Sequence, residues 1–200
     1  MINSTLSLFG TRLMVVLLLL GTAVQGQAAA LFTLKGTTDA VKYADDAEIR
    51  LSVLGWSDQE VIQSVVEGLG NYRTNGDSEV LRKLLQEQPT KGYLFTSAAT
   101  GHSIKYAWQD TSADYKRMVL LVIPALESIN PYRWKQANTT AEPFSLLELR
   151  GDGQQFVLKT AAGESVDVSS GSPLQLPDFA GADTFATLQD DTPYYLKPGS

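Results

Sequence analysis

Few side chains in this sequence could carry catalytic chemistry. The chain has a single histidine, His102, and no cysteine, so thiolate nucleophiles, disulfides and cysteine-based zinc sites are excluded. His102 could serve as a general base, but the adjacent Ser103 would point to the opposite face of a strand and could not be its partner. We therefore interpret His102 as a residue beside a hairpin turn and assign no catalytic residue.

Carboxylates are the remaining metal ligands in the sequence. Asp45, Asp46 and Glu48 could bind a hard cation such as calcium, but they lack the regular spacing of an EF-hand loop. We interpret them as a solvated turn before a strand, and Asp190 and Asp191 in the same way. No metal site and no cofactor are predicted.

Aromatic and cationic side chains alternate in Tyr132-Arg133-Trp134-Lys135, within an otherwise polar stretch. Such a pattern could line a pocket for an anionic or planar ligand through cation–π and stacking contacts. The predicted ligand-binding residues are Tyr132, Arg133, Trp134, Lys105, Tyr106 and Trp108. The alternative is that Tyr132 and Trp134 plug one end of the fold while the two cations stay in water.

The first thirty residues have the layout of a secretory signal peptide. They contain one basic residue, Arg12, no acidic residue, an apolar run from Leu13 to Val24, and small residues at their end. We expect cleavage near Ala28 or Ala30, which leaves residues 31–200 as a single globular domain with an extended, proline-containing C-terminal tail. The predicted location is the periplasm or the extracellular medium.

Composition restricts the partners of the mature chain. Without Arg12, 15 basic side chains face 22 acidic ones, so the net charge is −7. An acidic surface repels phosphate backbones, which argues against nucleic-acid binding. No later stretch is long and apolar enough to span a bilayer after signal cleavage. The partner, whether a protein or a small molecule, is not identified by the sequence.

Apolar periodicity predicts two helices near the N-terminus among many strands. A capping box at Ser57 and Glu60 opens the first helix, and Gly68 and Gly70 are expected to end it. A second helix follows the turn at Asn75-Gly76 and ends before Pro89. The predicted strands cover residues 31–37, 47–54, 93–95, 104–108, 118–122, 144–150, 155–160, 165–168 and 184–188.

Several turns connect these strands closely. Thr100-Gly101 is expected to form a hairpin turn, after which Ile104, Tyr106 and Trp108 would share one face. Short strands and tight turns predict an α+β fold, mainly an antiparallel β sandwich or partly closed barrel, with two short helices inserted near the N-terminus.

One set of segments resembles a family of uncharacterised secreted bacterial single-domain proteins. The segments are Lys91-Gly92-Tyr93, Ile104-Lys105-Tyr106-Ala107 after the Gly101 turn, the strand 117–122, and Pro143 to Arg150 with its glycine-rich turn. The resemblance covers roughly residues 81–159. It implies export and a single domain, and it carries no catalytic residue.

Three functional hypotheses follow from the sequence. The first is an exported envelope protein that acts as a non-enzymatic binding or interaction domain. The second is a small-molecule carrier with a barrel interior. The third is a hydrolase that uses carboxylates or His102.

Overall fold

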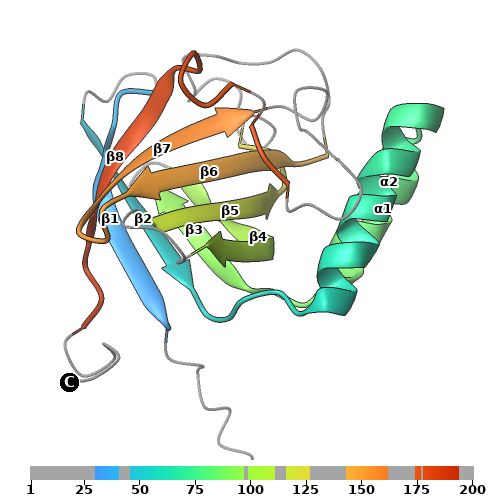
Figure 1. Cartoon of the computed structure of the whole chain (residues 1–200), viewed down its shortest axis with the longest axis horizontal. Helices are drawn as coiled ribbons and strands as arrows, with labels where there is room; N and C mark the ends of the chain where they lie inside the picture. Colours follow the sequence, from blue (N-terminus) through green and yellow to red (C-terminus); the bar gives the residue numbers. More distant parts are fainter. Residues whose placement is uncertain are drawn as a thin grey trace, which may run out of the picture.

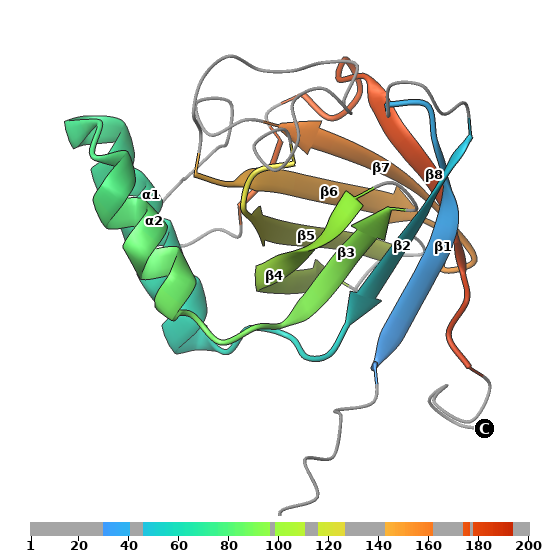
Figure 2. The same cartoon turned by 180° about the vertical axis from the view of Figure 1, so that it is seen from behind.

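The computed structural model contains a closed barrel of eight antiparallel strands (Figure 1; Figure 2). It describes residues 30–40, 46–96, 99–110, 116–126, 143–161, 174–176 and 178–193. The strands are β1 (Phe32–Thr38), β2 (Ala47–Val53), β3 (Gly92–Thr96), β4 (Ala99–Asp110), β5 (Lys116–Ile123), β6 (Ser145–Gly151), β7 (Gln155–Ala161) and β8 (Thr184–Asp190). Each strand pairs with the next, and β8 pairs with β1. Of the two predicted architectures the structure has the barrel, and it is fully closed instead of partly closed. The described strands form one sheet, so the sandwich alternative is not observed.

The barrel interior is packed with aliphatic side chains. Alternate residues of each strand point inward, as the period of two requires. These residues form one contiguous cluster, in which Leu34, Ile49, Leu51, Val53, Leu94, Ile104, Leu120, Leu147, Leu149, Leu158 and Leu188 are fully buried. Phe32 and Phe156 meet edge to face with ring centroids 5.7 Å apart. The interior is therefore a protein core.

Two antiparallel-packed helices, α1 (Gln59–Asn75) and α2 (Ser78–Glu87), connect β2 to β3 and lie beside the barrel (Figure 1). Their apolar stripes join the outward residues of β4, β5 and β6 in a second buried cluster, which includes Val65, Leu69, Leu85, Tyr106 and Leu121. One side of the barrel is thus covered by helices.

The start of α1 differs from the predicted capping box. Asp58 is the N-cap, and its carboxylate accepts a hydrogen bond from the Val61 amide at 2.9 Å. The Ser57 hydroxyl instead accepts the Ala107 amide of β4 at 3.0 Å. Ser57 therefore joins the helix entrance to the barrel wall, a long-range contact that a local motif does not reveal.

The end of α1 also differs from the prediction. The helix continues past Gly68 and Gly70 and ends at Gly76, whose backbone has φ of +70°. A Cβ at Gly68 would lie 3.0 Å from the Leu84 side chain, so this glycine permits close packing of α1 on α2. Gly76 suits the left-handed C-cap conformation because it has no Cβ.

Strand β4 corrects two further predictions. It begins at Ala99, so Gly101 lies within the strand and Thr100-Gly101 is not the hairpin turn. The pairing between β4 and β5 shifts between Ile104 and Tyr106, which marks a β-bulge. As a result Ile104 points into the barrel, whereas Tyr106 and Trp108 point outward, and the three do not share a face.

Some predictions fall outside the described residues. These are the signal peptide, the strand expected at 165–168 and the tail beyond residue 193. Within the described part of the chain, no helix combines the length and the apolar content needed to cross a membrane.

Candidate functional site

Of the six predicted ligand-binding residues, the structure describes Lys105, Tyr106 and Trp108. The Lys105 ammonium donates to the Gln86 and Gln88 carbonyl oxygens and to the Thr90 hydroxyl, at 3.3, 2.9 and 3.2 Å. These acceptors lie at and just beyond the end of α2, so Lys105 serves as a C-terminal cap. Burial lowers the pKa of Lys105.

Tyr106 and Trp108 belong to the core beneath the helices. Tyr106 is fully buried, and burial raises its pKa to about 12 against the opposing effects of the Leu174 backbone and the Arg117 charge. Trp108 is half-buried, with the Arg117 guanidinium 5.4 Å from its ring centroid. These two residues support packing and do not line a described pocket. Tyr132, Arg133 and Trp134 lie outside the described residues.

His102 lies inside the barrel instead of beside a turn. It stands opposite Leu94, whose side chain belongs to the inner cluster, and it is fully buried. Its Nδ1 atom is 2.9 Å from the Pro124 carbonyl oxygen. Burial lowers the pKa of His102, and the contact with Pro124 opposes that shift only in part. Ser103 is a half-buried neighbour that stands opposite Tyr93 on the outer face.

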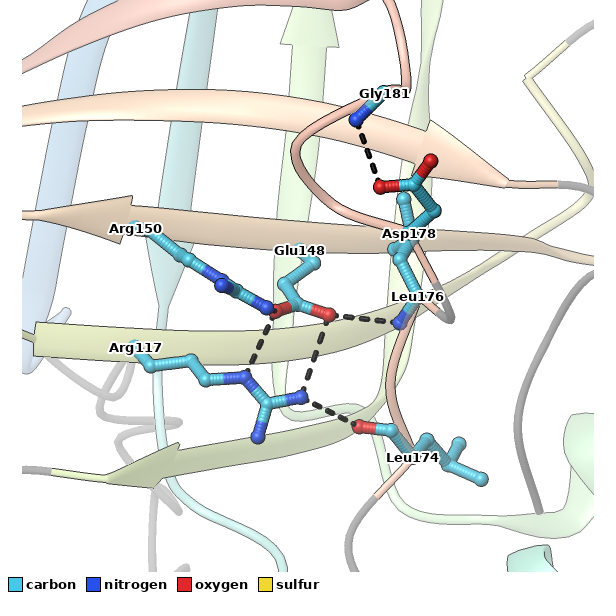
Figure 3. Close-up of polar contacts among 7 residues, drawn as sticks. All are labelled: Arg117, Glu148, Arg150, Leu174, Leu176, Asp178 and Gly181. Atoms are coloured by element: carbon cyan, nitrogen blue, oxygen red, sulfur yellow. Dashed lines mark hydrogen bonds and ion pairs between the residues drawn. The ribbon is translucent and has the colours of Figure 1, made fainter.

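A fully buried carboxylate, Glu148, lies on the outer surface of β6 between two arginines (Figure 3). Its Oε1 accepts from Nε of Arg117 and Nε of Arg150, each at 2.8 Å. Its Oε2 accepts from the Leu176 amide at 2.8 Å and from Arg117 at 3.3 Å. Arg117 also donates to the Leu174 carbonyl oxygen at 3.3 Å. The carboxylate thus joins β5 and β6 to a segment far away in the sequence.

These donors keep Glu148 ionised. Burial alone would raise the pKa of Glu148, but hydrogen bonds from Arg117, the Leu176 amide and Arg150 outweigh it, so the pKa lies below its ordinary value. A carboxylate with this pKa and with both oxygens occupied is a poor general base. The arrangement suits a structural role, in which Glu148 holds the segment around Leu176 against β5 and β6.

The segment held by Glu148 covers the outer surface of β6 and β7. We call residues 174–176 and 178–182 the covering segment. The Phe179 ring lies between two cations, with the Arg150 guanidinium 4.2 Å and the Lys159 ammonium 4.9 Å from its centroid. Lys159 also donates to the carbonyl oxygens of Ala180 and Ala182. This cluster was not predicted. The charged residues within the otherwise apolar strand 144–150 were nevertheless a sign that these charges have partners in the folded protein.

The opposite side of the barrel has neither helices nor the covering segment over it (Figure 2). We use the name open face for six of the residues that point outward from β1–β4 on this side: Lys35, Arg50, Ser52, Tyr93, Phe95 and Ser103. Tyr93 and Phe95 are 38% and 43% exposed, and their ring centroids are 5.8 Å apart. A pair of exposed aromatic rings on a sheet surface is a recognisable binding feature.

Gly101 supports the position of the Phe95 ring. A Cβ at Gly101 would lie 2.4 Å from Cε1 of Phe95, which is closer than two carbon atoms can approach. The ring therefore lies across the backbone of β4 at a place where only glycine leaves room. This explains why a glycine occurs within the strand.

Arg50 stands directly opposite Phe95 in the sheet, and Lys35 stands directly opposite Arg50. Lys35 forms an exposed ion pair with Glu48 at 3.2 Å. Within the part of the chain that the structure describes, the exposed Arg50 side chain has no carboxylate partner. This site was not predicted from the sequence, in which Tyr93 and Phe95 are simply residues of a strand.

An acidic hollow borders the open face. It is lined by β1, β2 and β8 and contains Asp46, Glu48, Asp190 and Asp191. Among the residues with described positions, no group of three or more histidines and carboxylates has an arrangement that could hold a metal ion. The acidic residues instead set the local charge around the two cations.

Comparisons with models of protein families, with curated proteins and with solved structures found no match.

Proposed function

We propose that this chain is an exported, non-enzymatic binding domain that contacts its partner through the open face. The observation that carries the proposal is the exposed Tyr93–Phe95 ring pair beside the Arg50 guanidinium, which has no carboxylate partner among the described residues. Aromatic residues and arginine are enriched at protein interfaces, and tyrosine and arginine also at binding hot spots. The other side of the barrel is already occupied by the helices and the covering segment.

The two other hypotheses have less support. An eight-stranded barrel can hold one small ligand or be filled by side chains, and the inner cluster of this barrel favours the second condition. For a hydrolase, His102 is enclosed in the barrel and Glu148 has both oxygens occupied. Native mass spectrometry of the purified protein tests the carrier hypothesis, because a carrier would retain a small molecule.

Export is proposed from the layout of residues 1–30. The intact mass of the chain recovered from fractionated cells tests it. We expect a mature chain that begins after Ala28 or Ala30, outside the cytoplasm. A full-length chain in the cytosol would contradict export without affecting the open face.

Site-specific photocrosslinking in cells tests the binding surface. A photoreactive phenylalanine derivative replaces Tyr93 on the open face or, as the control, Val80, which is 61% exposed on α2. We expect a discrete adduct from position 93 that is lost when Phe95→Ala is added, and no such adduct from position 80. The same adducts from both positions, or none from position 93, would contradict the proposal.

A further inference from the structure

The open face combines two kinds of recognition chemistry in adjacent rows of the sheet. Lys35, Arg50 and Phe95 lie side by side across β1, β2 and β3. In the next row Tyr93 lies between two hydroxyl groups, Ser52 of β2 and Ser103 of β4. A ligand on this face would thus meet cations in one row, hydroxyl groups in the other, and an aromatic ring in each.

The aromatic pair fits the flat side of a sugar ring. A pyranose presents apolar C–H groups on its face and hydroxyl groups around its edge, so it can stack on an aromatic ring and still form hydrogen bonds at its rim. The 5.8 Å between the Tyr93 and Phe95 rings is close to the length of one sugar unit in an extended chain. Ser52 and Ser103 flank Tyr93, where the edge of a stacked sugar would lie.

The charges on and around the face select the kind of sugar chain. Arg50 is a cation without a carboxylate partner in the described part of the chain, whereas Lys35 is already paired with Glu48. A guanidinium binds a carboxylate through two parallel hydrogen bonds. The neighbouring acidic hollow and the net charge of −7 of the mature chain, with 15 basic against 22 acidic side chains, would repel a ligand with a carboxylate on every unit. A single available cation, Arg50, in acidic surroundings favours a sugar chain whose carboxylates are widely spaced.

From this charge complementarity we infer that the open face binds a glycan that carries isolated carboxylate groups. Two successive sugar rings stack, one on Tyr93 and one on Phe95, and a neighbouring carboxylate pairs with Arg50. This inference rests on the proposed function of the open face and adds the chemical class of its ligand.

Three hexasaccharides test the inference by isothermal titration calorimetry of the mature chain. A hyaluronan hexasaccharide carries a carboxylate on every second sugar, chitohexaose carries none, and hexagalacturonate carries one on each sugar. We expect the hyaluronan fragment to bind about tenfold more tightly than chitohexaose, since one charge-assisted contact is gained. Hexagalacturonate should bind more weakly than the hyaluronan fragment. Added salt should reduce the preference for hyaluronan over chitohexaose.

Variants identify which groups are responsible. Arg50→Gln should lower the hyaluronan affinity about tenfold, to that of chitohexaose, and Arg50→Lys should restore part of it. Tyr93→Ala combined with Phe95→Ala should abolish binding of both glycans. Gly101→Ala keeps every contacting side chain but displaces the Phe95 ring, so it should weaken both glycans alike. Val80→Ala on α2 is the matched control and should change nothing.

The outcomes separate the ligand class from the function itself. If neither the hyaluronan fragment nor chitohexaose binds but position 93 still crosslinks in cells, the glycan inference is wrong and the binding surface stands. If chitohexaose binds as well as hyaluronan and Arg50→Gln has no effect, the role of charge is wrong. If hexagalacturonate binds most tightly, the requirement for widely spaced carboxylates is wrong.

Discussion

On the outer surface of β4–β7, two helices and the covering segment bury Tyr106, Val119 and Glu148. On the outer surface of β1–β3, in contrast, Lys35, Arg50 and Phe95 are in contact with water. Both sides belong to the same closed sheet and both contain aromatic and charged residues. On the covered side Glu148 and its two arginines satisfy one another. On the open side an aromatic pair is exposed, and the Arg50 cation has no carboxylate partner among the described residues. The same residue types thus stabilise the fold on one side and can bind a ligand on the other.

The covered side also shows what completes a charged cluster. Glu148 receives hydrogen bonds from two arginines and from the Leu176 amide, and Phe179 fills the space between Arg150 and Lys159. The carboxylate is supplied by the sheet, and the amide and the ring by the covering segment. On the open face the described residues supply no equivalent of that segment, which is why a ligand is expected there.

The two sides should differ most in the loss of unfolding free energy when one aromatic residue on each is replaced. Tyr106→Ala should lower the free energy of unfolding by roughly 4 kcal/mol, because a fully buried ring leaves a cavity in the second core. Phe95→Ala should cost about 1 kcal/mol or less, since the ring is 43% exposed. Urea denaturation followed by circular dichroism measures both. Equal losses would mean that the two sides do not differ in their structural role.

The next largest difference in unfolding free energy is expected from a matched pair of carboxylate replacements, one on each side. Glu148→Gln should lower the free energy of unfolding by about 3 kcal/mol, because it leaves two arginines without their buried counter-charge. Glu48→Gln, which breaks the exposed pair with Lys35, should change it by no more than about 0.5 kcal/mol. Hydrogen exchange should also show faster amide exchange of the covering segment in Glu148→Gln alone. Unchanged exchange there would mean that Glu148 does not hold the covering segment.

The positions of the strands could be predicted from the sequence because alternation is a local property. The interior of the barrel repeats this pattern from β1 to β8, and the strand predicted at residues 118–122 lies within β5. The alternation failed at Lys105, where a bulge moves Tyr106 to the outer surface. A bulge depends on pairing with another strand, so the sequence of β4 alone does not reveal it.

The candidate site could not be predicted from the sequence because its residues are brought together by cross-strand register. Arg50 and Phe95 are 45 positions apart in the sequence but stand directly opposite each other in the sheet. The same reason explains why Glu148 was not connected to Leu176, which lies in a segment that the sequence indicated only as part of a proline-containing tail. A local pattern such as the pair Tyr132 and Trp134 carries no information about cross-strand neighbours.

Acid should loosen the covered side before the open side. The pKa of Glu148 is held below its ordinary value of 4.5, so its contribution to stability is complete above about pH 4.5 and is lost as the pH falls through the folded-state value. The difference in unfolding free energy between the wild type and Glu148→Gln should therefore be constant from pH 7 to pH 5 and shrink below about pH 4.5. Urea denaturation at a series of pH values measures it. If the difference in unfolding free energy persisted to pH 3, the stabilisation by Glu148 would not depend on its charge.

The smallest expected difference in unfolding free energy comes from the replacement of one lysine on each side. Lys105→Met should lower the free energy of unfolding by about 1 kcal/mol, because the ammonium caps the carbonyl oxygens of Gln86 and Gln88 at the end of α2. Lys35→Met on the open face should have almost no effect, since its ion pair is exposed. Hydrogen exchange in the last turn of α2 should increase only in the first variant. If Lys35→Met were the more destabilising of the two, the open face would have a structural role, and the argument that its side chains are available to a ligand would lose its basis.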